Sequence, residues 1–219
     1  MKSTLRPSRT ETLAWLAIYF LVLAWSAIAP KDRFTWWLEV SPALIGFAVL
    51  AVTWRHFPLT RLVYWLILVH CIVLFIGGHY TYAEVPLFDW IRDQFHLQRN
   101  NYDKVGHFAQ GFIPAMIARE LLIRLRVVNG AAWRNLFILS FVLAFSAFYE
   151  LVEWWVALAS GDDAVAFLAT QGDPWDTQSD MLLALIGAIA ALLLLSRAHD
   201  RQLQPFLSRK SESQPSGES

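Results

Sequence analysis

The sequence is poor in cysteine and in charge. Cys71 is the one cysteine among 219 residues, which excludes an intrachain disulfide and a zinc site built from several cysteines. Charged residues make up 16% of the chain, against about 25% in a typical soluble domain. Eighteen basic residues balance eighteen acidic ones, so the chain lacks the net positive charge that nucleic-acid binding uses. We therefore expect no nucleic-acid partner.

Familiar catalytic signatures are also missing. The sequence contains no Gly-x-Ser-x-Gly, no phosphate-binding glycine loop, no His-Glu-x-x-His and no Cys-x-x-Cys. The motifs therefore give no support to an α/β-hydrolase, a P-loop NTPase, a zinc protease of that type or a thiol oxidoreductase.

Apolar residues, in contrast, make up 56% of the chain and gather into six blocks. Each block approaches the roughly 20 residues that cross a bilayer, and the first exceeds the about 7–15-residue apolar core of a signal peptide. The sequence predicts an all-α fold in which residues 1–200 form one domain of six transmembrane helices embedded in the lipid bilayer. The blocks cover approximately residues 13–29, 36–54, 62–77, 104–122, 136–158 and 181–195.

Lys and Arg are distributed unevenly between the two sides of this predicted bundle. Thirteen lie in the N-terminal head, the second and fourth loops and the tail, whereas five lie in the remaining loops. Because cytoplasmic loops carry the excess of Lys and Arg, both termini are expected in the cytoplasm.

Two segments outside the six blocks have their own character. Residues 86–97 place Leu87, Ile91 and Phe95 on one helix face and polar residues on the other, which predicts a short helix in the membrane interface. Residues 201–219 are polar and rich in serine, which predicts a disordered cytoplasmic tail.

Ionisable residues occur in pairs at the predicted outer ends of the helices. Because a charged side chain within a membrane costs free energy, its presence there indicates a structural or functional role. Spacings of three or four residues place each pair on one helix face. Four polar residues follow the third block on the same side, namely His79, Tyr80, Tyr82 and Glu84, and Glu39 begins the second block there. The pairs are Asp103 with His107, Glu150 with Glu153, and Asp176 with Asp180. These groups are predicted to meet in one pocket.

Carboxylates beside an imidazole suit a divalent cation. The candidate catalytic residues are His107, Glu150 and Asp180, the candidate metal ligands are these three with Asp103, and no particular metal is indicated. The supporting polar residues are His79, Tyr80, Glu84, Asp103, Glu153 and Asp176. Without a metal, the same cluster predicts an acid–base pair or a proton relay.

Structural roles compete with these functional ones. Asp103 could cap its helix, and Thr177 with Asp180 matches a capping box. His79, Tyr80 and Glu84 could be solvated by lipid head groups, as could Glu39 near the surface. His70 lies in the middle of the third block, which is typical of a hydrogen-bonded core histidine.

Four segments give the chain a resemblance to the YjdF-type bacterial inner membrane proteins. The resemblance covers about residues 10–200 and implies a multi-pass inner membrane protein, while that family brings no established reaction. The segments are residues 77–86 (GGHYTYAEVP), 102–108 (YDKVGHF), 149–154 (YELVEW) and 171–181 (QGDPWDTQSDM).

A more distant similarity is to the VanZ-like membrane proteins, which are linked to glycopeptide resistance. Those proteins share an Asp-Lys-x-x-His motif, which here is Asp103, Lys104 and His107. They continue with a Glu and with an Asp that opens the last helix, for which Glu150 and Asp180 are the candidates. An Asn expected one turn later is absent.

Two classes of function remain open at this stage. The first is a site at the outer leaflet, with a divalent metal as one option, that acts on a lipid, lipid-linked or small-molecule substrate of the envelope. The second is a non-enzymatic role as a small-solute or proton-coupled transporter or an interaction subunit. Neither an enzymatic activity nor an oligomeric state is indicated by the sequence.

The uneven Lys and Arg distribution generates a test of topology. A reporter that is active only in the cytoplasm should be active when fused after Arg126 or Arg201. The same reporter should be inactive when fused near Asp93 or Asp163. Activity at Asp163 would contradict the predicted arrangement, because it would scatter the proposed pocket over both membrane faces.

Overall fold

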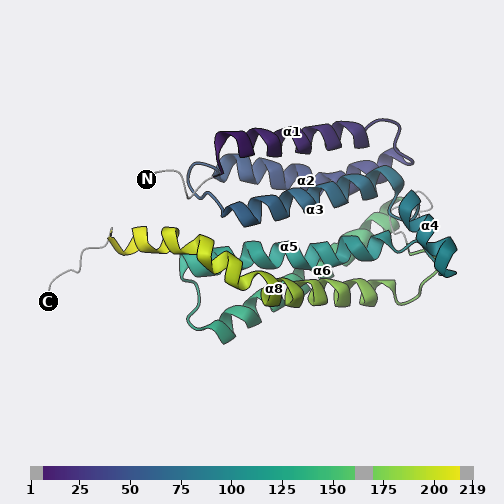
Figure 1. The fold of residues 1–219 in the computed structure, drawn as a ribbon. Coiled ribbons are helices and arrows are strands. Elements are labelled where there is room, and N and C mark those ends of the chain that lie inside the picture. Colours follow the sequence, from purple (N-terminus) through teal and green to yellow (C-terminus); the bar gives the residue numbers. More distant parts are fainter. Residues whose placement is uncertain (1–6, 161–169, 213–219) are drawn as a thin grey trace.

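A computed structural model describes residues 7–160 and 170–212 of the chain, and these residues form helices and connecting turns without a β-strand. The described residues contain seven helices (Figure 1), which confirms the all-α class. Their bounds are α1 Arg9–Ser26, α2 Arg33–Thr53, α3 Arg61–Tyr80, α4 Pro86–Phe95, α5 Tyr102–Leu125, α6 Ala131–Ser160 and α8 Asp176–Glu212.

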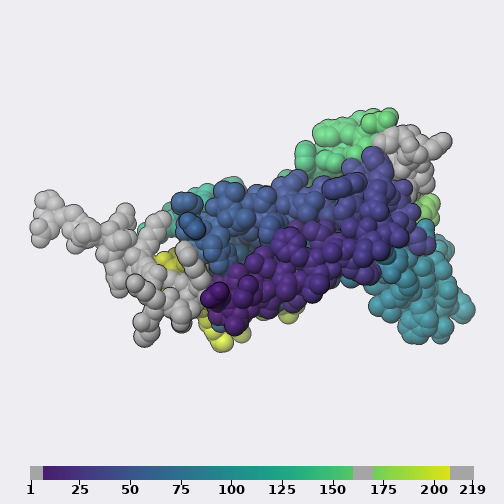
Figure 2. Space-filling view, turned by 90° about the horizontal axis from the view of Figure 1, so that it is seen from above, coloured from purple at the N-terminus to yellow at the C-terminus, as the bar shows by residue number. Residues whose placement is uncertain are grey.

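The six longer helices lie roughly side by side and alternate in direction along the chain, with α1, α2 and α3 on one side and α5, α6 and α8 on the other (Figure 1). Helix α4 lies across the bundle axis at one end and projects from it in the space-filling view (Figure 2). We call this the α4 end. The start of α1 and the last turns of α8 lie at the opposite end, which we call the terminal end.

A helix stands at each of the six predicted blocks, but six transmembrane helices are not confirmed. Within the described residues, four helices are long and apolar enough to cross a membrane: α2, α3, α6 and the part of α8 from Asp176 to Leu207. Helix α1 begins with Arg9 and Glu11, and both lower its mean hydropathy. Helix α5 carries ionisable residues along much of its length, and most of them are buried in the bundle.

The most extensive packing in the bundle joins α5 to α8, and small residues make it possible. A Cβ atom built on Gly111 would lie 1.7 Å from the carbonyl oxygen of Ala184, and one built on Gly187 would lie 2.2 Å from the oxygen of Phe108. Ala184, Ala188 and Ala191 are fully buried along the same face of α8. Membrane helices approach each other closely through such residues.

A second polar cluster is buried at the terminal end of the same two helices. The carboxylate of Glu120 accepts hydrogen bonds from the backbone and hydroxyl of Thr60, from Arg124 and from Nε2 of His199. Arg119 donates to Nδ1 of His199 at 3.0 Å and pairs with Asp200 at 2.7 Å. Glu120 and His199 are fully buried, and their mutual bonds offset the cost of that burial.

The disordered tail predicted for residues 201–219 is wrong for its first part, because α8 continues to Glu212. Residues 201–207 pack on other parts of the chain through contacts that their composition does not predict. Leu203 is 1% exposed, Gln202 accepts a hydrogen bond from the backbone of Leu62, and the Arg124 guanidinium lies 4.2 Å from the centre of the Phe206 ring. Residues 213–219 lie outside the described part of the chain. The predicted interfacial helix at 86–97 is helical as α4.

The close approach of α5 and α8 predicts unequal effects of two glycine substitutions. Gly111→Ala should destabilise the protein by about 1–3 kcal/mol, because the added methyl group meets backbone that must move away. Gly46→Ala in α2 is the matched control, since its Cβ has no atom within 4 Å. Thermal unfolding in detergent measures both, and equal stability of the two variants would contradict the close α5–α8 packing.

Candidate functional site

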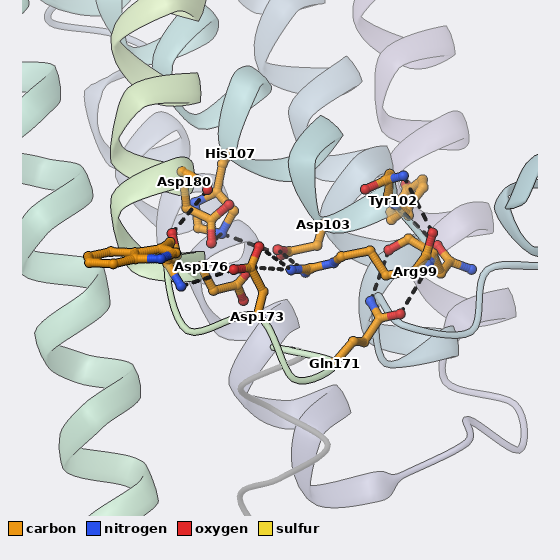
Figure 3. Close-up of polar contacts among 12 residues, drawn as sticks. Arg99, Tyr102, Asp103, His107, Gln171, Asp173, Asp176 and Asp180 are labelled. Atoms are coloured by element: carbon orange, nitrogen blue, oxygen red, sulfur yellow. Dashed lines mark hydrogen bonds and ion pairs between the residues drawn. The ribbon is translucent and has the colours of Figure 1, made fainter. Parts of the chain in front are cut away.

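His107 lies at the centre of the polar cluster at the α4 end (Figure 3). Its Nε2 atom is 3.4 Å from Oδ1 of Asp103 and 3.7 Å from Oδ2 of Asp180. One ligand atom from each of these three residues lies within 4.8 Å of the other two. All three residues are less than 8% exposed. The site is thus an imidazole between two buried carboxylates.

Helix register explains why these three side chains meet. Asp103, His107 and Gly111 follow one another at intervals of four residues along one face of α5. Asp180 precedes Ala184 by four residues on α8, and Ala184 is the residue that touches Gly111. The contact at Gly111 therefore fixes the position of the two helices along each other. One helical turn from this contact, it brings Asp180 of α8 beside His107 of α5.

The other ring nitrogen of His107 has a different environment. Its Nδ1 atom lies 3.0 Å from Oε1 of Gln110, and a carbonyl oxygen can only accept a hydrogen bond. Nδ1 therefore carries a proton, and Nε2 is the nitrogen that faces the two aspartates. Oε1 of Glu150, on α6, lies 3.9 Å from Nδ1 and so belongs to this second side of the ring.

Two carboxylate oxygens of the cluster lack the partners that buried polar atoms normally have. Oδ1 of Asp180 and Oε1 of Glu150 are buried without a hydrogen bond to any described residue. A buried acceptor left without a donor costs about 1–3 kcal/mol. The arrangement is therefore favourable only if a proton, a cation or a donor group joins these oxygens.

Arg99 closes the cluster on its outer side. The guanidinium forms an ion pair with Asp176 and lies 3.5 Å from both Asp173 and Asp103. Burial disfavours the charge of Arg99, yet the hydrogen bond to Asp176 and the neighbouring carboxylates hold the pKa of Arg99 above its usual value. Arg99 thus ties the segment before α8 to the start of α5.

A cavity of about 110 Å³ lies beside His107. Its polar wall includes Asp103, His107 and Gln110 from α5, together with Glu39 from α2 and Glu153 from α6. Pro42, Leu74 and Phe145 give the cavity an apolar wall. The tyrosine hydroxyl of Tyr149 donates a hydrogen bond to Glu39 at 3.3 Å. The cavity therefore suits a guest with one polar and one apolar part.

The structure brings some of the predicted site residues together and separates others. Asp103, His107, Glu150 and Asp180 form the cluster, Glu153 lines the cavity, and Asp176 reaches the cluster only through Arg99.

His79, Tyr80 and Glu84 are not part of the cluster. The His79 ring packs on Trp25 and bonds to the carbonyl of Ser26, with the Tyr80 ring against it, and the exposed Glu84 pairs with Lys31.

The structural alternatives predicted from the sequence have mixed outcomes. Asn101 occupies the N-cap position of α5, so Asp103 lies inside the first turn and its carboxylate turns to His107 and Arg99. Helix α8 begins at Asp176, so Asp180 lies in its second turn rather than at a cap. Solvation of Glu39 is wrong, because this side chain is 5% exposed. His70 lines the cavity from α3.

Three residues that matter for the site were not singled out by the sequence. Two had a usable signal, since Arg99 precedes Asp103 by four residues and Gln110 follows His107 by three. Tyr149 lines the cavity from α6, and local spacing gives no signal for it. Tyr82, which was predicted to lie at this end, lines the cavity from the turn after α3.

Comparisons with known proteins agree with the membrane character of the bundle. Residues 11–201 match the family described as "Predicted membrane protein (DUF2238)". The chain is 47% identical over 206 residues to the inner membrane protein YjdF of Escherichia coli (strain K12), covering 94% of this chain and 98% of YjdF. No solved structure matches the chain. This similarity and the apolar helices support a location in the bacterial inner membrane, and the chain belongs to the DUF2238 family of membrane proteins.

Proposed function

We propose that the chain is a six-span inner membrane protein with a divalent-cation site at the outer leaflet that handles the head group of a lipid or lipid-linked envelope substrate. In this topology both termini are cytoplasmic and the α4 end faces outward. The excess of Lys and Arg at the terminal end supports this orientation. The alternating direction of six long helices supports the even number of spans.

The polarity of α5 is compatible with a sixth span. Asp103, His107, Arg119 and Glu120 are each less than 8% exposed, and all face the interior of the bundle rather than its rim. Ionisable residues within membrane helices typically face the interior of a bundle and pair with one another. Mean hydropathy counts these side chains as if lipid surrounded them, and so it underrates α5 as a span.

The observation that carries the cation site is the separation of Nε2 of His107 from two aspartate oxygens. At 3.4 and 3.7 Å, these contacts exceed the about 2.7–3.2 Å of a good hydrogen bond. Ligands about 2.1 Å from one tetrahedral metal ion lie roughly 3.4 Å from each other. The two distances from Nε2 are thus close to that between ligands of a shared ion.

The surroundings of His107 support the same assignment. Gln110 accepts a hydrogen bond from Nδ1–H, so a neutral His107 would direct the lone pair of Nε2 toward the aspartates, as in protein sites where a second residue orients a ligating histidine. One imidazole with two carboxylates favours Mn²⁺, Fe²⁺ or Zn²⁺ over Ca²⁺. Glu150, on the Nδ1 side of the ring, is placed to accept or donate a proton rather than to share this ion.

The lipid part of the proposal rests on the position and lining of the cavity. It adjoins His107 at the α4 end, between a wall of carboxylates and a wall formed by Pro42, Leu74 and Phe145. An ion held by Asp103, His107 and Asp180 would polarise an oxygen of a head group in this cavity. The exposed apolar residues of α2 and α6 would contact the attached acyl chains.

Elemental analysis of detergent-purified protein tests the cation site. The wild-type protein should retain about one divalent ion per chain, and His107→Ala or Asp180→Asn should each abolish retention, because the ion needs all its ligands. The double variant should lose nothing further, since parts of one site are not additive. His96→Asn is the control, because His96 is exposed and lies outside the cluster.

Glu150→Gln separates the cation site from a metal-free polar core. It should keep the ion if Glu150 acts only as a proton carrier. Thermal unfolding of the same variants measures their stability and can contradict the cation site. A wild-type protein without metal, together with additive losses of stability in the His107 and Asp180 variants, would overturn the cation site.

A further inference from the structure

The cavity beside His107 is lined by three carboxyl groups. Glu39, Asp103 and Glu153 line it, and none of the described residues along its wall is Lys or Arg. Asp103 is already engaged by Arg99 and His107. Glu39 accepts a hydrogen bond from Tyr149 and has the Tyr82 hydroxyl as a second neighbour, whereas no hydrogen bond or ion pair joins Glu153 to another described residue. Two carboxyl groups therefore face the cavity without a basic partner, and their ionised forms are costly there unless a cation joins them.

Aromatic rings surround the same space. Phe145, Tyr149 and Glu153 follow each other at intervals of four residues, so they form one stripe of α6 along the cavity. Tyr82 adds a third ring from the turn after α3. Carboxylates combined with aromatic faces attract ammonium groups through ion pairing and cation–π interaction. A phosphate or another anion would meet neither Lys nor Arg among the described residues of this wall.

The cavity lies where a lipid head group could reach it from the side. It is bounded by α2 and α6, and these helices pack on α3 and on α5 with α8 rather than extensively on each other. The Tyr149–Glu39 hydrogen bond links them at the cavity. Phe145 is 39% exposed, so the apolar wall extends to the lipid-facing surface. A volume of about 110 Å³ is well below that of a pocket for a whole ligand, and it fits a head-group fragment.

One unpartnered acceptor behind the His107 ring indicates the chemistry of this fragment. Oε1 of Glu150, whose side chain is 8% exposed, is buried without a hydrogen bond and lies 3.9 Å from the His107 ring that lines the cavity. A primary ammonium group offers three N–H donors, whereas a quaternary ammonium offers none. The wall therefore favours a primary amine over a choline group.

From these observations we infer that the cavity binds the primary ammonium group of an aminophospholipid, with Glu39 and Glu153 as its partners and the rings of Tyr82 and Tyr149 beside it. This inference deepens the proposed function and rests on it for the role of the site. The phosphate of such a head group would lie toward the cation ligands, so the ammonium and phosphate groups would each meet charge of the opposite sign.

Binding of short-chain lipids to the full-length protein in detergent, measured by native mass spectrometry, tests the inference. Dihexanoyl phosphatidylethanolamine should bind at least tenfold more tightly than dihexanoyl phosphatidylglycerol or phosphatidylcholine. Glu153→Gln should reduce this preference about tenfold. Glu84→Gln is the matched control, because Glu84 lies at the same end, is exposed and pairs with Lys31 outside the cavity. It should leave the preference unchanged.

Phe145→Trp provides a variant without a change of charge. The larger ring should narrow the cavity and weaken phosphatidylethanolamine binding, with the melting temperature verifying that the variant is folded. Equal binding of the three lipids, or a Glu153→Gln variant with the wild-type preference, would overturn the inference. Free ethanolamine that binds as tightly as the lipid would overturn its lipid part, since a soluble amine would then suffice.

Measuring the same preference after metal removal keeps this inference separate from the proposed cation site. A protein without any bound metal that still prefers phosphatidylethanolamine would support amine binding and contradict the cation site. A protein with stoichiometric metal and no lipid preference would support the cation site and contradict amine binding.

Discussion

The contact between the backbones of α5 and α8 is the constraint on which the site depends. Gly111 and Gly187 let the two helices approach until a single methyl group would not fit, and the buried alanines of α8 continue the contact. Such an approach has one stagger, because each glycine must meet a particular carbonyl of the other helix. That stagger places Asp180 against His107 at one end and His199 against Glu120 at the other. Small residues in the middle thus determine which charged residues meet at the ends.

Burial of charged residues on α5 is the second organising feature of the bundle. It separates the properties that local sequence predicts from those that depend on neighbouring helices. The six apolar blocks predicted the six long helices, because the length of an apolar segment is a local property of the sequence. The pairing of Asp103 with His107 also followed from local spacing. Whether α5 crosses a membrane depends instead on what covers its polar face, and that is decided by α3, α6 and α8. The same reason explains the tail, since Leu203 and Phe206 pack on parts of the chain far away in sequence.

The remaining differences concern residues whose partners come from other helices. Glu39 lies in the second turn of α2, and its position near the predicted membrane surface suggested contact with solvent, yet α6 brings Tyr149 onto it. His79, Tyr80 and Glu84 lie at the same end of the bundle as the site residues. However, the ring of His79 contacts residues at the end of α1, and Glu84 pairs with Lys31. Topology can place residues at one end of a bundle. The direction of each side chain depends on the rotation of its helix, which the sequence of a single chain does not specify.

The alanine and glycine seam has a consequence for electrical insulation. Between His107 and Glu120 the α5–α8 interface contains buried small apolar residues, including Ala115 and Ala188 at 0% exposed. Beyond Gln110, these described apolar side chains separate the two polar clusters along the interface and give protons or ions no polar group to bind. In the proposed topology the membrane potential would fall across this seam. Proton or ion exchange at the outer cluster would then proceed without dissipating the energy stored across the membrane, unlike exchange in a transporter, whose site must open to both sides in turn.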